Sequence, residues 1–335
     1  MGRLINTSRA SLLFALALFL VLAAALIVVV RWMTPPKTAR LLPESDAIVY
    51  INVKPIRAAT HFDRNPVSRS ADLQSFVEAT GIVPERDLNE AAFALHRMSD
   101  PSGPNGPVGY SEVFEGRFDG QRLDRYLASQ ATARETYDGH TIYTIPITDG
   151  SVIRPLRVTA LDGRSVAASN MPTPEQIHSI LDRHRSWFVS GSALLTARFH
   201  DVPLLASAWG VGRLGLPFSD HGAISAFGLQ LPLATDTDFV ASLRYTGSLH
   251  LRIEQIADSE ADAERTARVL GGVLGLFKSI QKMQQPSGSG AAYLQMIASL
   301  RLERHKDRVI LTATIPTELL RQLTAANSGA AASIQ

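Results

Sequence analysis

The stretch SLLFALALFLVLAAALIVVV begins at Ser11 and ends at Val30, and it runs for twenty residues without a charge. At about 1.5 Å per residue, an α-helix of this length measures roughly 30 Å, which matches the hydrocarbon thickness of a bilayer. A helix can cross lipid because it satisfies its backbone hydrogen bonds internally. We therefore predict a transmembrane anchor at residues 11–32, behind a short N-terminal tail at residues 1–10.

The apolar stretch favours an uncleaved anchor over a cleavable signal peptide. It is longer than the roughly 7–15 residues of a signal core, and Arg31, Trp32 and Pro35 follow it in place of a small-residue cleavage site. Basic residues flank both ends, so the positive-inside rule does not decide the orientation. The short N-terminal tail is typical of a signal-anchor. It predicts a single-pass protein of the inner (cytoplasmic) membrane, with its body on the periplasmic or outer side.

The rest of the chain has a different composition. Five of the 33 Lys and Arg residues lie in residues 1–40, and the remaining 28 are balanced by 31 acidic residues. A body with this balance has no extended positive field, so we predict no nucleic-acid partner. The chain has no cysteine, which excludes disulfides, thiolate nucleophiles and Cys-based metal sites.

Hydrophobic patterns and turn signals predict an α+β fold, in which a soluble body of antiparallel sheets with packed helices follows the transmembrane helix. The run AIVYINV at residues 47–53 is typical of a central strand, and Asp138-Gly139 lies between β-forming residues as in a hairpin. Ser259 is expected to cap a long helix. The expected organisation is a linker at residues 33–45, a first α+β unit at 46–189, a glycine-rich connecting region at 190–238, a second α+β unit at 239–325 and a disordered tail at 326–335.

An internal match indicates a repeat. Residues 156–173 align without a gap on residues 300–317, and each stretch combines a hairpin with a Pro-Thr helix start. Arg164 falls on Arg308 in this alignment. The match predicts two duplicated ferredoxin-like units, and chance similarity is the alternative that the sequence leaves open.

The beginning of the body carries a family resemblance. Leu42, Pro43 and Asp46 come shortly after the predicted anchor and open the first strand. In this layout the chain resembles uncharacterised single-pass membrane-anchored exported proteins of bacteria, a family of unknown function. The resemblance implies the anchored, exported architecture and no activity.

Three patterns resemble catalytic or cofactor motifs but lack essential parts. Gly210, Gly212 and Gly215 match G-x-G-x-x-G, but Pro217 disfavours the helix that would have to present its amides to a phosphate. Ser192 lacks the second glycine of a nucleophile elbow. The histidines are scattered without an H-x-x-x-H spacing. We therefore predict no catalytic, cofactor-binding or metal-binding residues, and no cofactor.

One helix face is a candidate for packing or for binding a partner. Gly271 and Gly275 lie four residues apart in the helix expected after Ser259, with Leu274 and Phe277 beside them. Glycines at this spacing permit close approach of another backbone. We expect tight packing against a sheet, and a face for a partner or a membrane surface is the alternative.

These observations favour a non-catalytic, membrane-anchored envelope protein that binds or scaffolds other envelope components. Its partners would be the membrane, through residues 11–30, and proteins of the cell envelope. Two alternatives remain: an exported hydrolase whose site has no recognisable motif, and a pilus or secretion-assembly subunit.

Overall fold

The computed structural model describes Phe19, Leu22 and residues 34–64, 69–101, 103, 105–149, 152–186, 191–213, 223–226, 229–232, 237–283 and 290–319. The chain divides into two compact units, Met1–Pro36 and Lys37–Gln335. The predicted anchor lies outside the described residues except for Phe19 and Leu22, and so does the tail at residues 326–335. Among the residues that are described, no helix is both long enough and apolar enough to cross a membrane.

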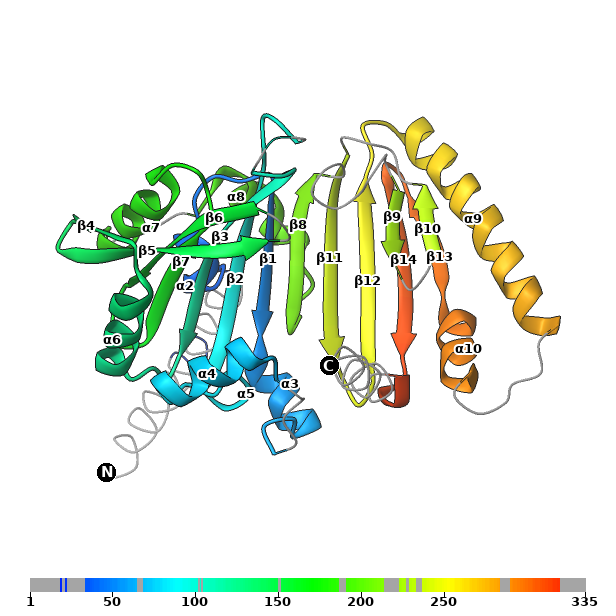
Figure 1. Cartoon of the computed structure of the whole chain (residues 1–335). Coiled ribbons are helices and arrows are strands. Elements are labelled where there is room, and N and C mark those ends of the chain that lie inside the picture. The colour runs from blue at the N-terminus through cyan, green and yellow to red at the C-terminus, as the bar shows by residue number, and fades with distance from the viewer. Residues whose placement is uncertain are drawn as a thin grey trace, which may run out of the picture. The chain divides into compact units, whose positions relative to one another are not determined.

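The second unit begins with the strands of the first half of the sheet and the helices that pack on them, which we together call the first half (Figure 1). Its elements are α2 (Lys37–Leu41), β1 (Ala47–Asn52), α3 (Val53–Thr60), α4 (Ala71–Thr80), α5 (Pro84–Asp87), β2 (Leu88–Arg97), β3 (Val108–Gly116), α6 (Gly120–Gln130), β4 (Ala133–Tyr137), β5 (His140–Asp149), β6 (Val152–Ala160), β7 (Ser165–Ser169) and α7 (Glu175–Arg185).

The second half follows α7. It comprises α8 (Ala193–Arg198), the 3₁₀ helix η1 (Phe199–Asp201), β8 (Ala208–Arg213), β9 (Ala223–Ala226), β10 (Leu229–Pro232), β11 (Asp238–Tyr245), β12 (Leu249–Ile256), α9 (Glu260–Met283), α10 (Gly290–Ser299), β13 (Arg301–His305) and β14 (Arg308–Ile315).

Both halves belong to one antiparallel sheet, which confirms the α+β class. In the described part of the chain its twelve strands have the order β13-β14-β12-β11-β8-β1-β2-β3-β7-β6-β5-β4, and β9 and β10 form a separate hairpin. The halves join where β1 pairs with β8. Outward from this junction the two halves have the same order of strands: β1-β2-β3-β7-β6 in the first half corresponds to β8-β11-β12-β14-β13 in the second. The helices also correspond, because α6 follows β3 in the first half, and α9 and α10 follow β12 in the second.

The two faces of the sheet are covered differently. On the side that we call the α7 face, α2, α7 and α8 bury apolar residues of the first half and of the junction, including Tyr50, Val113 and Trp209. The opposite side, the α6 face, is covered by α4 and α6 in the first half. In the second half α9 and α10 cover the same side. Over β12 and β14 the α7 face is reached, among the described helices, by the short η1 through Asp201 and by no longer helix.

Several local predictions are confirmed. Asp138 and Gly139 both have positive φ in the β4–β5 turn, as a two-residue hairpin loop requires. Ser259 Oγ accepts a hydrogen bond from the Asp262 amide 3.2 Å away at the start of α9. Strand β8, however, lies inside the predicted connecting region at residues 190–238. Strands β9 and β10 lie in the same region, so part of the predicted connecting region is sheet.

The glycines of the G-x-G pattern have a packing role in β8. A Cβ atom on Gly212 would lie 2.5 Å from the Cβ of Ala47 on the neighbouring strand β1. Real Cβ atoms do not approach this closely, so glycine permits the two strands at the junction to pair. Gly210 lies in the same strand, and Gly215 is outside the described residues.

The gapless internal alignment is correct for one strand of each hairpin and slips by one residue in the other. Arg157 pairs with Ser169 across β6 and β7, whereas Arg301 pairs with Thr312 across β13 and β14. The second hairpin is one residue shorter between these pairs. A shift of one residue moves a side chain to the other face of a strand. Structurally, Ser169 therefore corresponds to Thr312, and Arg308 does not correspond to Arg164.

Candidate functional site

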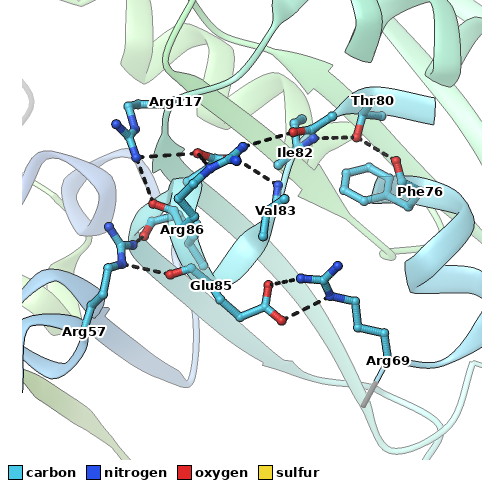
Figure 2. A network of polar contacts seen from close by, with 12 residues as sticks. Arg57, Arg69, Phe76, Thr80, Ile82, Val83, Glu85, Arg86 and Arg117 are labelled. Atoms are coloured by element: carbon cyan, nitrogen blue, oxygen red, sulfur yellow. Dashed lines mark hydrogen bonds and ion pairs between the residues drawn. The ribbon is translucent and has the colours of Figure 1, made fainter. Parts of the chain in front are cut away.

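The corner formed by α3, α4 and α5 is held by a polar network (Figure 2). Arg69 donates two hydrogen bonds to the Glu85 carboxylate, at 3.2 and 3.0 Å. Asp87 is buried, accepts a hydrogen bond from Arg86 at 2.6 Å and lies 3.6 Å from Arg117. Burial alone raises the pKa of Asp87, but hydrogen bonds and the charges of Arg86 and Arg117 outweigh burial and lower it. Each carboxylate is already paired, so we interpret this network as structural.

An open groove with a volume of about 890 Å³ lies on the α7 face of the second half. Strands β11, β12 and β14 contribute its floor, and residues 200–206 after α8 contribute one wall. The end of α10 and the start of β13 line the opposite side. The groove is therefore built where the described helices leave the sheet uncovered.

The strand register arranges the polar side chains of the floor in two rows. Arg301, Thr312, Arg252 and Ser242 are successive partners across β13, β14, β12 and β11. Two residues along the strands, Thr314, His250 and Arg244 form the second row. With strands roughly 4.8 Å apart, the backbones of Arg301 and Arg252 are about 10 Å apart. Arg252 and Arg244 are diagonal neighbours at roughly 7–8 Å.

Two of the three arginines in the groove have no anionic partner among the residues that the structure describes. Arg244 and Arg301 are exposed and make no ion pair there, whereas Arg252 donates to Glu254 at 2.6 Å. An unpaired guanidinium keeps all five N–H donors available in a planar fork. The groove therefore offers two free cations together with hydroxyl donors.

The acidic groups beneath the groove are already neutralised. Arg308 Nη1 donates to Asp201 Oδ1 at 2.8 Å and to Glu254 Oε1 at 2.7 Å. The side chains of Asp201 and Glu254 are only 5% and 4% exposed. The hydrogen bonds from Arg308 to the two carboxylates raise the pKa of the guanidinium above its ordinary value. This buried triad fixes the wall to the floor. Arg308 and Arg252 together balance the charges of the two carboxylates, so Arg244 and Arg301 remain as the excess positive charge among the described residues of the groove.

Hydroxyl groups, and no acid, surround the histidine of the floor. His250 Nε2 lies 3.2 Å from Ser248 Oγ, and its Nδ1 lies 3.5 Å from Thr314 Oγ1. No carboxylate hydrogen-bonds to His250 within the part of the chain that is described, so these residues do not form a Ser-His-acid triad. No group of three or more His, Asp or Glu side chains suited to a metal is present in that part either.

The wall of the groove ends in an exposed apolar turn. Leu204 and Leu205 are 58% and 68% exposed, and Leu204 lines the groove. The Ala206 amide donates to the Pro203 carbonyl at 3.3 Å, and Leu205 has φ 65°. This turn position favours glycine or asparagine, and a leucine is unfavourable there. Neither packing nor backbone preference explains the two leucines.

The first half has neutral, buried groups at the positions of Arg244 and Arg252, whereas Arg301 corresponds to another arginine, Arg157. Outward from the junction, the pairing registers match His96 with Arg244, Ser111 with Arg252 and Ser169 with Thr312. His96 Nε2 lies 3.0 Å from Ser111 Oγ, which lies 3.1 Å from Ser169 Oγ. Burial lowers the pKa of His96, although Asp46 opposes the change.

One carboxyl of the first half has no described partner. Glu112 lies on the α6 face of β3, opposite Phe93 on β2. Burial raises its pKa to about 7. It makes no hydrogen bond or ion pair with any described residue. The corresponding position of the second half is Ile253, so this carboxyl is specific to the first half.

The helix face predicted for packing is only partly buried. A Cβ on Gly275 would meet nothing within 4 Å, and one on Gly271 would meet only Leu302 Cδ2, at 3.8 Å. Leu270 is buried and Leu274 packs against α10 and the strands, so the leucines and not the glycines make the contact. Tight packing through Gly275 is therefore wrong. The side chain of Phe277 is outside the described residues, and partner binding by this face stays a prediction.

Sequence reasoning missed the arginines of the groove. The signal was present in β12, where His250, Arg252 and Glu254 alternate with Leu251 and Ile253. Such alternation indicates a strand with one polar face. It did not show that three neighbouring strands place their polar residues on one surface, because that depends on their pairing.

Comparisons with known proteins identify no function. No family model and no curated protein matches the chain. Among solved structures, crystal forms III and IV of TP0453 each align with a TM-score of 0.46, at 11% and 12% identity. They cover 88% and 89% of this chain, and 99% and 98% of the other. Crystal form I aligns with a TM-score of 0.44 at 10% identity, over 89% of this chain and 99% of the other. At this level the similarity carries no functional argument.

Proposed function

We propose that this chain is a non-catalytic, membrane-anchored envelope protein that binds another envelope component in the groove of its second half. The observation that carries the proposal is the polar floor around Arg244 and Arg301, which the described helices leave open. Arginines on a sheet surface are ordinary when scattered, but here they face a cavity large enough for a ligand or a partner segment.

Comparison with the first half supports binding at this place. Arg157 corresponds to Arg301, and it donates to the carbonyls of Met171 and Pro172 at 2.7 and 3.1 Å. These carbonyls lie in the segment that leads into α7, so Arg157 holds the chain that covers its own half. Arg301 has no such segment among the described residues. A second molecule would supply the acceptors that Arg301 lacks.

The two halves also support a duplicated unit. Their matching strand order, the antiparallel β1–β8 junction and helices on the α6 face at corresponding points all fit one α+β unit repeated in tandem. A duplicated scaffold can keep one copy for stability while the other copy acquires a binding surface.

Anchoring by residues 11–30 and a body on the periplasmic side belong to the same proposal. The full-length protein should resist alkaline carbonate extraction, and protease added to spheroplasts should digest the body beyond about Lys37. Protection of the body until lysis would reverse the proposed orientation.

The binding function is tested with the full-length chain in detergent. We would compare proteins that co-purify from membranes with the wild type, with Arg244→Glu/Arg301→Glu and with the control Arg125→Glu on exposed α6. A partner of the groove should be retained by the wild type and by the control and lost from the double variant. The purified partner should then bind the wild type and the control variant again, and should not bind the double variant. Identical sets of partners for all three proteins would refute docking in the groove.

A further inference from the structure

We infer that the groove binds the phosphate headgroup of an anionic phospholipid, with Leu204 and Leu205 against the acyl chains. This inference rests on the proposed function, since it assigns a chemical class to the component that the groove binds. Two observations that are separate in the molecule support it: the donor set of the floor and the apolar turn of the wall.

The floor is suited to phosphate. Arg244, Arg252 and Arg301 supply guanidinium donors, and Ser242, Thr312 and Thr314 supply hydroxyls on the same surface. Guanidinium forks bind phosphate oxygens in pairs and keep their charge at any physiological pH. Asp201, the carboxylate among the described lining residues, is buried and accepts from Arg308 through Oδ1, so its charge is opposed by an adjacent guanidinium.

The spacing of the donors favours a ligand larger than one free anion. The backbones of Arg244 and Arg252 are roughly 7–8 Å apart and those of Arg252 and Arg301 about 10 Å apart, whereas Arg244 and Arg301 are three strands apart, at roughly 15 Å. One small anion therefore does not reach both unpaired arginines without their long side chains bending toward it. A volume of about 890 Å³ greatly exceeds that of inorganic phosphate. A headgroup with its glycerol and the beginning of the acyl chains would occupy more of this space.

The wall distinguishes a lipid from a water-soluble phosphate. Leu204 and Leu205 project from a turn whose neighbours Phe199, Val202 and Ala206 are packed in the core, so the turn is held in place. Two leucines in water at the rim of a cationic groove are unfavourable in the free protein. They would gain apolar contact only with a ligand that has an apolar part beside its charge.

The test uses the full chain in nanodiscs of phosphatidylcholine and separate sucrose-loaded vesicles. The wild type should co-sediment with vesicles that contain phosphatidylglycerol and not with vesicles of phosphatidylcholine alone. Arg244→Gln/Arg301→Gln should weaken this binding at least about tenfold. Leu204→Ser/Leu205→Ser should weaken it about threefold or more. Arg244→Lys/Arg301→Lys should retain part of the binding, because the charge remains.

Matched controls come from the first half. Arg125→Gln removes an exposed charge from α6, and Ile153→Ser removes an exposed apolar side chain from β6, so both should bind within about twofold of the wild type. Thermal melting of every variant checks that the fold is retained. If Arg244→Gln/Arg301→Gln does not fold, the lysine variant and the Leu204→Ser/Leu205→Ser variant decide the question.

Soluble competitors separate the sources of the anion. Glycerol 3-phosphate should compete weakly, and its inhibition should depend on the arginines and not on the leucines. Competition by tripolyphosphate at micromolar concentration, without any effect of the leucine variant, would show a free polyphosphate ligand. Competition by polyglutamate would show an acidic protein segment. Either result overturns the lipid inference, and so does binding that is unchanged in Arg244→Gln/Arg301→Gln. A co-purifying protein lost only from the glutamate double variant would leave the proposed function standing.

Discussion

The two halves of the sheet share a strand order but close the α7 face in different ways. In the first half, helices cover this face and its polar groups have partners within the protein: His96, Ser111 and Ser169 are neutral and bonded to one another, and Arg157 donates to two backbone carbonyls. In the second half, the corresponding positions are Arg244, Arg252 and Thr312, and they line a groove. The difference shows that the packing of helices on a sheet face restricts which side chains that face can carry. A charged side chain buried beneath a helix is costly unless it is paired, whereas a face open to solvent can carry unpaired charges.

Exchanging the residues at corresponding positions of the two halves should give a large change in the free energy of unfolding. His96→Arg places a larger, charged side chain in a buried neutral cluster, where the nearby Asp46 already accepts the Arg97 amide, and it should cost about 2–4 kcal/mol or prevent folding. The reverse change, Arg244→His, lies on the open face and should stay within about 0.5 kcal/mol. Urea unfolding followed by Trp209 fluorescence measures both. Similar costs for the two exchanges would contradict the difference in cover.

The ion triad beneath the groove gives an effect of similar size. Arg308→Leu leaves Asp201 and Glu254 buried without their shared partner, so the free energy of unfolding should fall by about 3–5 kcal/mol. The exposed Arg304→Leu on the neighbouring strand is the control and should change it by less than about 0.5 kcal/mol. A loss equal to that of the control would mean that the triad does not hold the wall to the floor.

Glu112 tests a difference between the halves on the α6 face, where the second half has Ile253 at the corresponding position. Its folded pKa of about 7 lies above its ordinary value, so the folded state prefers the neutral acid and loses stability as pH rises from about 4.5 through 7. Glu112→Gln should therefore raise the free energy of unfolding at about pH 8 by about 1–3 kcal/mol and have little effect near pH 4. Unfolding curves at both pH values check this. Parallel pH profiles for variant and wild type would show that Glu112 is not buried.

His96 should change the pH dependence of stability in the opposite direction to Glu112, and by a smaller amount. Its pKa is lowered by burial, so the unfolded chain takes up a proton below about pH 6.5 that the folded chain resists. Stability should fall as pH decreases through that window. His96→Gln keeps a donor for Ser111 and removes the titration, so its stability should depend less on pH there. Hydrogen exchange of β2 and β3 amides at neutral and acidic pH provides a local measurement.

The glycines of α9 give the smallest effect. Gly275 lies in an open part of the helix, so Gly275→Ala should raise the free energy of unfolding by about 0.5–1 kcal/mol. Gly212→Ala in β8 is the contrasting control and should destabilise, because its Cβ would overlap Ala47. Destabilisation by Gly275→Ala would show that the helix is closely packed after all. Normal melting with a lost partner would support the partner-binding alternative for this face.

Local features were predictable because they depend on neighbours in the chain. The Asp138-Gly139 turn follows from turn chemistry and the Ser259 cap from helix capping. The repeat was also visible in the sequence, although the shorter second turn displaced its last strand by one residue. Strand β8 was missed because glycine and alanine weaken the pattern on which strand prediction depends.

The sequence by itself determined the apolar stretch at residues 11–30, the α+β class and the positions of most strands and turns, because each depends on short-range periodicity or backbone preference. Only the tertiary structure decided that the two halves form one sheet, that α7 covers one half and that Arg244, Arg252 and Arg301 share a surface. Those three arginines are brought onto one surface by strand pairing that joins Arg252 to Thr312 across 60 residues of chain. Pairing at such distances is set by the burial of all the strands and helices together, and no local pattern encodes it.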